Sequence, residues 1–218
     1  MGNVYELSNR RLYLCVGYRD DMESFLPAVL RGGVDVVQLR EKGLSDERRL
    51  EVARLMVPVC RDFDVPFIVN DSPDLALAAS ADGVHVGQDD VSVATCRRIL
   101  GDDAIVGLST HATEEFEAAL AQPATYLSAG PIVPTPTKQG RAGTGVAYAV
   151  TCQQRSQRPV FVTGGVNAAN IAELVRAGLR HFVVVRALTD SADPYTSARA
   201  LRGALDEALS TVTIEPAQ

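Results

Sequence analysis

The sequence predicts a single-domain α/β protein of the (β/α)8 TIM-barrel class. Eight short apolar runs alternate with segments of helical spacing, and no Pro-, Gly- or Ser-rich linker divides the chain. Strands that alternate with helices form βαβ units and a parallel sheet. Eight such units in roughly 200 residues fit a closed barrel. A doubly wound open sheet is the alternative, but no G-x-G-x-x-G motif follows the first run.

Each expected strand is a run rich in Val, Ile, Leu and aromatic residues. Periodicity alone does not separate such a run from a buried helical segment, so the regular alternation carries the assignment. The expected strands are 11–16, 34–39, 66–70, 83–87, 104–109, 125–129, 159–164 and 181–185.

Three of the intervening segments carry clear helix signals. Segment 46–63 has an apolar stripe opposite its charges, and segment 167–178 opens with Asn and stops at Gly. In segment 193–209 the helix is expected to begin after Asp193, with Pro194 at the first helical position. We expect one domain over residues 1–218, with its core at 11–210 and a loose tail at 211–218.

Composition excludes several classes of function. The chain has 218 residues, 46% hydrophobic and 22% charged, which is typical of a globular domain. Its net charge of −6 and lack of a basic stripe argue against nucleic-acid binding. No apolar run is long enough for a membrane span, and no signal peptide is recognisable, so we expect a cytoplasmic protein. The four cysteines and three histidines show no zinc spacing, and nothing indicates an oligomeric state.

Polar residues follow seven successive expected strands, where the catalytic loops of such a barrel lie. The residues singled out after these strands are Gln38, Arg40 and Lys42; Asn70 and Asp71; Gln88, Asp89 and Asp90; Ser109 and His111; Thr135, Thr137 and Lys138; the glycine pair Gly164 and Gly165; and the turn at Val185 and Arg186. Gln38, Arg40 and Lys42 alternate, so in an extended strand they point the same way.

Each of these residues also has a structural explanation. Asp71, and Asp89 or Asp90, could cap the helices that follow them, and Arg40 and Lys42 could be surface charges. The glycine pair could form a tight turn. Histidines within the expected strands, His85 and His181, are expected to be structural.

Sorted by charge, the set predicts a site for a multiply charged anion. Arg40, Lys42 and Lys138 supply cations, and Asp71 with a second aspartate supplies hard oxygen ligands. Two carboxylates with phosphate oxygens and waters suit Mg²⁺, which points to a diphosphate. The glycine pair and the Val185–Arg186 turn precede helices, where backbone N–H groups bind a separate phosphate.

The motifs together resemble the thiamine-phosphate synthase family. They are "QLREK", "NDSPDLALAASADGVHVGQDD", "GLSTH", "GPIVPTPTK", "TGGVN" and "VVVRAL", in this order. The resemblance implies a (β/α)8 barrel transferase of thiamine biosynthesis. Such an enzyme joins 4-amino-5-hydroxymethyl-2-methylpyrimidine diphosphate to a thiazole phosphate by a dissociative, carbocation-like route.

The resemblance also assigns roles to individual residues. It implies that small-molecule substrates meet the catalytic residues Arg40, Lys42, Ser109 and Lys138, and that Asp71 and Asp90 bind Mg²⁺. Further pyrimidine-diphosphate contacts are Gln38, Leu39, Glu41 and Asn70. Thiazole-phosphate contacts are Thr135, Pro136, Thr137, Gly165, Val185 and Arg186.

Two other functions are compatible with the barrel. A related thiazole tautomerase uses a histidine as acid–base, and His111 keeps this alternative open. A tautomerase needs no diphosphate-binding site, whereas the cations and aspartates of this sequence predict one. A non-catalytic sensor of phosphate ligands would not need an intact metal pair.

Overall fold

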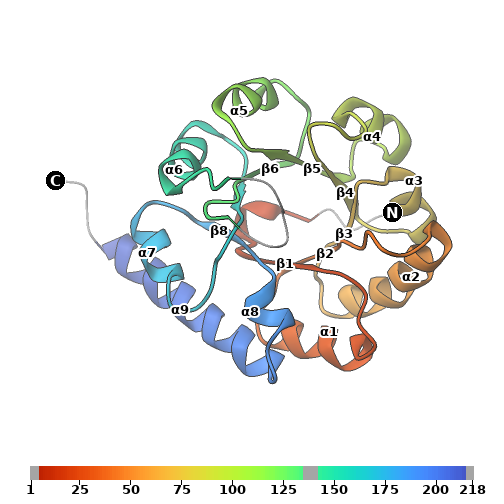
Figure 1. Ribbon diagram of the computed structural model, residues 1–218, viewed down its shortest axis with the longest axis horizontal. Helices are drawn as coiled ribbons and strands as arrows, with labels where there is room; N and C mark the ends of the chain where they lie inside the picture. The colour runs from red at the N-terminus through yellow and green to blue at the C-terminus, as the bar shows by residue number, and fades with distance from the viewer. Residues whose placement is uncertain (1–4, 135–141, 215–218) are drawn as a thin grey trace.

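The predicted barrel is confirmed in the computed structural model, which describes residues 5–134 and 142–214. Within these residues eight parallel strands hydrogen-bond in chain order, and β8 pairs with β1 (Figure 1). The strands are β1 Leu12–Val16, β2 Val36–Leu39, β3 Phe67–Asn70, β4 Gly83–Val86, β5 Ile105–Thr110, β6 Tyr126–Ala129, β7 Val160–Val162 and β8 His181–Val184. Each predicted strand agrees with its observed one to within two residues at either end.

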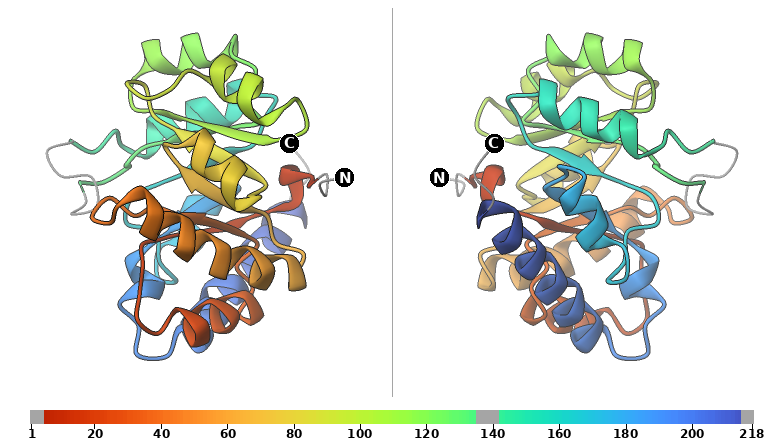
Figure 2. Two further views of the ribbon diagram at one scale, coloured as in Figure 1. Left: turned by 90° about the vertical axis from the view of Figure 1, so that its right-hand side faces the viewer. Right: turned by 90° about the vertical axis from the view of Figure 1, so that its left-hand side faces the viewer.

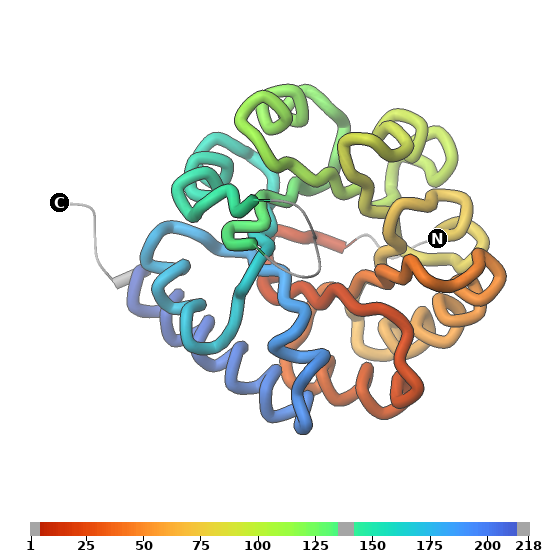
Figure 3. The backbone as a smooth tube through the Cα atoms, viewed as in Figure 1, coloured from red at the N-terminus to blue at the C-terminus, as the bar shows by residue number. Residues whose placement is uncertain are grey.

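Helices form a ring around the barrel (Figure 1). They are α1 Met22–Arg31, α2 Asp46–Asp62, α3 Pro73–Ala79, α4 Val93–Leu100, α5 Thr113–Leu120, α6 Val146–Arg155, α7 Ile171–Arg176, α8 Arg186–Thr189 and α9 Pro194–Ile214. A short 3-10 helix, η1 Leu7–Asn9, precedes β1. The last helix, α9, lies beside α1 and completes the ring (Figure 3). None of the described helices has the length and hydropathy needed to cross a bilayer.

The helix ends correct two expectations. Pro194 opens α9, as predicted, and Asp193 caps it, because the Asp193 carboxylate accepts from the Thr196 backbone N–H at 3.0 Å. The helix continues to Ile214, however, so the expected loose tail is wrong for residues 211–214. Helix α7 begins at Ile171 rather than near Asn167, because residues 167–170 form turns in which Asn170 accepts from the Asn167 N–H.

The barrel separates two apolar layers. Outward-facing strand residues pack against the helices, and inward-facing residues form a second cluster that includes Tyr13, Tyr126 and Phe161. Tyr5 and Leu7 pack against this inner cluster, and η1 lies at one end of the barrel (Figure 2). That end is therefore filled by side chains, which leaves the opposite end, where the strands finish, for a ligand.

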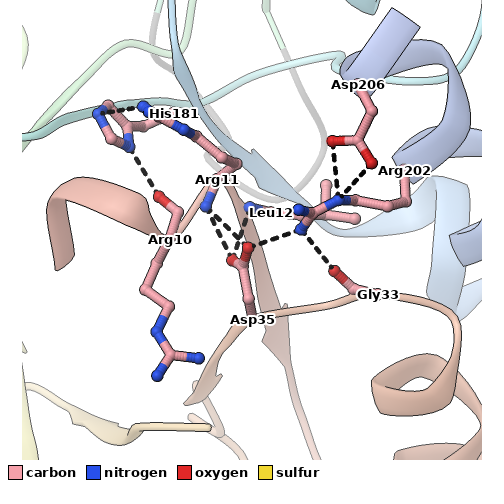
Figure 4. Close-up of polar contacts among 8 residues, drawn as sticks. All are labelled: Arg10, Arg11, Leu12, Gly33, Asp35, His181, Arg202 and Asp206. Atoms are coloured by element: carbon pink, nitrogen blue, oxygen red, sulfur yellow. Dashed lines mark hydrogen bonds and ion pairs between the residues drawn. The ribbon is translucent and has the colours of Figure 1, made fainter. Parts of the chain in front are cut away.

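A buried carboxylate joins three elements at the filled end (Figure 4). Asp35 accepts from the backbone N–H groups of Arg11 and Leu12 and from the Arg202 guanidinium, all within 2.9 Å. Arg202 also contacts Asp206 along α9. These bonds hold α9 against the start of β1 and the residue before β2.

Candidate active site

A cavity of about 340 Å³ opens where the strands end. Its floor is made by inward-facing strand residues, and its rim by the loops after β2, β6, β7 and β8. The residues of the floor are Tyr13, Cys15, Gln38, Asn70, His85, Ser109, Tyr126 and Ser128. The rim includes Arg40, Pro131, Gly164, Gly165, Val185 and Arg186. A buried, polar floor beneath two arginines suits a heteroaromatic ligand that carries an anionic group.

Asp71 and Asp90, from the loops after β3 and β4, approach each other. Burial raises the pKa of Asp71, and the adjacent Asp90 carboxyl raises it further, while Lys42 opposes both effects at 3.2 Å. Asp71 itself has a left-handed backbone, with φ of 65°. Its N–H donates to the His85 carbonyl at 2.8 Å, which fixes this turn.

The capping explanation of these aspartates is wrong. Ser72 caps α3, because its hydroxyl accepts from the Leu75 N–H, and Ser92 caps α4 by accepting from the Thr95 N–H. Asp90 instead accepts from the Gly87 N–H at 2.8 Å, which folds its carboxylate back toward the barrel. Both carboxylates are thereby left free of helix capping.

The segment after β2 does not keep the strand alternation that was expected. Gln38 and Arg40 both line the cavity, but β2 ends at Leu39, and Lys42 reaches Asp71 from a bend beyond the strand. Leu39 is buried in the layer between barrel and helices, facing away from the cavity. Glu41 accepts from the backbone N–H groups of Tyr18 and Gly43, so its carboxylate ties two loops together.

The rim after β7 requires glycine. Gly164 and Gly165 have φ of 100° and 74°, in the left-handed region. A Cβ on Gly164 would lie 2.8 Å from the Ile132 backbone nitrogen. The carbonyl of Gly165 accepts from the side chains of Asn167 and Asn170, which holds the turn open toward the cavity. Val185 and Arg186 face the same space from the start of α8.

The described histidines have separate partners. His85 is the satisfied core histidine expected, although it also lines the cavity floor. His181 is structural, as expected, and its ring contacts the Arg10 carbonyl at the filled end. His111 directs its Nδ1 to the Gly130 carbonyl and is not among the residues that line the cavity. This placement makes His111 a poor acid–base for a ligand there.

Four predicted residues, Thr135, Pro136, Thr137 and Lys138, lie outside the described part of the chain. Asn70 and Ser109 both face the cavity from the ends of their strands. No three His, Cys, Asp or Glu side chains gather at a metal-binding distance within the described residues.

Sequence reasoning missed several lining residues. Tyr13, Cys15, Tyr126 and Ser128 all lie inside expected strands rather than after them. The alternation of side chains along a strand could have identified them. Residues 13 and 15 lie on the inward face of β1, and residues 126 and 128 lie on the inward face of β6. Thr163 was also missed, and its buried hydroxyl has no hydrogen-bond partner within the described structure.

Comparisons with known proteins agree with this architecture. A family model described as thiamine monophosphate synthase matches residues 12–188. A thiamine-phosphate synthase from Acidothermus cellulolyticus is 47% identical over 199 residues, covering 88% of this chain and 93% of the relative. Another from Thermosynechococcus vestitus is 40% identical over 90% of this chain, which spans 56% of that relative's length. A solved thiamine phosphate pyrophosphorylase from Pyrococcus furiosus has a TM-score of 0.83 and 28% identity, covering 92% and 97% of the two chains.

Proposed function

The chain belongs to the thiamine monophosphate synthase family, and from this premise we propose how its barrel mouth carries out the reaction. The enzyme joins a 4-amino-5-hydroxymethyl-2-methylpyrimidine diphosphate to a thiazole phosphate, giving thiamine monophosphate and diphosphate. The observation that carries the proposal is the approach of Asp71 and Asp90, with the Lys42 ammonium 3.2 Å from the Asp71 carboxylate.

The donor set fits a divalent cation. Two neighbouring carboxylates repel each other, and the raised pKa of Asp71 reflects both its burial and that repulsion. Lys42 offsets the charge of one carboxylate, that of Asp71. Asp71 and Asp90 would hold Mg²⁺ together with phosphate oxygens and waters, as Mg²⁺ sites with few protein ligands do. When bound, the ion would neutralise charge that accumulates on the leaving diphosphate.

We assign the pyrimidine ring to the polar floor and its diphosphate to the cations beside it. Arg40 faces the cavity and Lys42 stands at Asp71, so both would stabilise negative charge on the departing group. Gln38, Asn70 and Ser109 line the floor, where they would orient the ring. Family resemblance adds Lys138 to the cations, as a proposal from sequence alone.

We assign the thiazole phosphate to the rim after β7 and β8. Gly165, Val185 and Arg186 face the cavity together, and backbone N–H groups in such turns suit a phosphate. Resemblance assigns Thr135, Pro136 and Thr137 to the thiazole ring. The thiazole nitrogen would then attack the pyrimidinylmethyl cation that remains after diphosphate departs. Such a step depends on placement and charge stabilisation more than on an acid–base residue.

The reaction is tested with the purified full chain, both substrates and a magnesium series. We expect diphosphate and thiamine monophosphate to form in equal amounts, and both to stop when the metal is chelated. Thiazole isomerisation without diphosphate release would instead identify a tautomerase. Binding of both phosphates without turnover would identify a sensor.

Substitution tests the metal assignment. Asp71→Ala should lower turnover by about 100-fold, because stabilisation of the leaving group is lost. Asp74→Ala is the matched control, since Asp74 is an exposed aspartate three residues further along. Turnover of Asp71→Ala close to that of the unmodified protein at limiting magnesium would remove Asp71 from the site.

A further inference from the structure

A continuous chain of hydrogen-bonded side chains crosses the cavity floor. We call it the floor relay, and it consists of Cys15, Gln38, Tyr13, Tyr126, His85, Ser109 and Ser128. All seven residues are buried and all seven line the cavity. The relay therefore joins two residues assigned to the pyrimidine, Gln38 and Ser109, across the full width of the barrel.

The first half of the relay runs from β2 to β6. Gln38 Nε2 donates to the Tyr13 hydroxyl at 2.8 Å, and the Tyr13 and Tyr126 hydroxyls lie 2.8 Å apart. The Cys15 thiol donates to Gln38 Oε1 at 3.4 Å. Both ends of the Gln38 amide are thereby engaged.

The second half runs from β6 through β4 to β5. The Tyr126 hydroxyl lies 2.9 Å from His85 Nδ1, and His85 Nε2 lies 2.8 Å from the Ser109 hydroxyl. Ser109 lies 3.2 Å from the Ser128 hydroxyl. The His85 and Tyr126 rings stack with centroids 5.5 Å apart, so the imidazole has little freedom to turn.

The backbone is shaped for this arrangement at Gly107. A Cβ there would lie 2.4 Å from His85 Nδ1 and 2.4 Å from the Tyr126 hydroxyl oxygen. Any larger residue would displace the bond between the two side chains. The absence of a side chain at Gly107 in β5 thus leaves the space that the His85–Tyr126 contact occupies.

One arrangement of protons runs through the relay in a single direction, although the hydroxyl–hydroxyl and imidazole links allow either partner to donate. In that arrangement Tyr13 accepts from Gln38 and donates to Tyr126, and Tyr126 donates to His85 Nδ1. A neutral imidazole has one donor and one acceptor nitrogen, so Nε2 then donates to Ser109. Burial raises the pKa of Tyr13 and of Tyr126, which keeps both phenols protonated. In the fully reversed direction Gln38 Oε1 would accept from Tyr13, and His85 would carry its proton on Nδ1.

We propose that Tyr126 and His85 are positioning residues that lock the donor and acceptor ends of the Gln38 amide and thereby select the amino form of the pyrimidine. The inference rests on the proposed function, in which Gln38 meets the pyrimidine ring. An aminopyrimidine edge presents a ring-nitrogen acceptor beside an amino donor, and a side-chain amide pairs with such an edge through both ends. The 4-oxo analogue presents the reverse pattern, which suits the flipped amide.

The test compares the 4-amino and 4-oxo pyrimidine diphosphates as substrates. Tyr126→Phe keeps the ring packing but removes the link, so the preference in kcat/KM for the amino substrate should fall about tenfold, the size of one net hydrogen bond. The KM for thiazole phosphate should not change. Tyr148→Phe is the matched control, because it removes a phenol that donates to Thr110 outside the relay. If Tyr126→Phe only disturbed the structure, kcat/KM would fall equally for the two substrates. An unchanged preference for the amino substrate would therefore overturn the proposal.

A second measurement needs no relay variant. The ring-nitrogen NMR shifts of His85, assigned with His111→Gln and His181→Gln variants, should report a proton on Nε2 and none on Nδ1. A proton on Nδ1 would reverse the relay and overturn the proposal even where Tyr126→Phe fails to fold. If the unmodified protein condenses the amino substrate but Tyr126→Phe keeps the preference for it, the positioning role of the relay is wrong and the proposed function stands. If it releases no diphosphate at all, the proposed function itself fails.

Discussion

Asp90 occupies a different position from its neighbour Asp89, although the two carboxylates are chemically identical. The Asp90 carboxylate accepts from the Gly87 N–H at 2.8 Å and approaches Asp71. An asparagine can keep the first of these contacts through its amide oxygen, while it loses the charge that a cation requires. Neutralising each aspartate in turn therefore tests which of the two carboxylates binds the cation.

We expect Asp90→Asn to raise the magnesium concentration for half-maximal activity by about tenfold or more, because one of the two carboxylate ligands is lost. Asp89→Asn should leave that concentration within a factor of about two, as a surface change does. The measurement is a magnesium titration of diphosphate release for both variants. Equal effects, or a larger effect at Asp89, would mean that the wrong aspartate has been assigned.

The types of the metal-binding residues could be predicted from the sequence, but their contacts could not. The sequence indicated acidic ligands after two neighbouring strands, but it left open whether Asp71 was a helix cap. That question depended on which residue takes the capping position, and Ser72 takes it one residue later. Asp71 adopts a left-handed backbone instead, a local choice that composition does not reveal.

Helix α9 depends on one buried carboxylate at the filled end of the barrel. Asp35 joins the Arg11 and Leu12 N–H groups to the Arg202 guanidinium, and its side chain is only 12% exposed. Removing the carboxylate leaves two backbone donors and a guanidinium without their acceptor. Since these groups lie at the opposite end from the cavity, stability and catalysis should separate.

We expect Asp35→Ala to lower the free energy of unfolding by about 3 kcal/mol, because a buried ion pair loses one partner. Urea unfolding measures the loss, and the turnover of the folded fraction should stay unchanged. Asp206→Ala removes an exposed partner of the same arginine and should cost at most about 0.5 kcal/mol. Comparable losses in the two variants would show that Asp35 is not the anchor of α9.

Elements were more predictable than the directions of their side chains. The β-branched and aromatic runs located all eight strands because a strand inside a barrel is buried on both faces. Lys42 shows where this approach failed, since β2 ends at Leu39 and the chain bends before Lys42. Tyr13 and Tyr126 show a second failure, because residues within strands were treated as core although one face of each strand lines the cavity.

At the scale of the whole molecule, the barrel closes where β8 meets β1, and a histidine lies at this seam. His181 Nδ1 contacts the Arg10 carbonyl at 2.7 Å, and Nε2 lies 3.2 Å from the Arg11 guanidinium (Figure 4). Arg11 has only protons to donate, so Nε2 must accept and the ring must be neutral. Burial, with the positive charges of Arg11 and Arg180, lowers the pKa of His181 to about 4.

Closure of the barrel should therefore be sensitive to acid. Between the unperturbed pKa of 6.5 and the folded value of about 4, the unfolded chain binds a proton that the folded barrel does not. The free energy of unfolding should fall as pH is lowered through this window, by about 3 kcal/mol from this residue. Urea unfolding at neutral pH and near pH 4 should show that His181→Gln loses less stability on acidification than the unmodified protein, because glutamine does not titrate. If both proteins lost stability in parallel, proton uptake at the seam would not be what weakens the closed barrel.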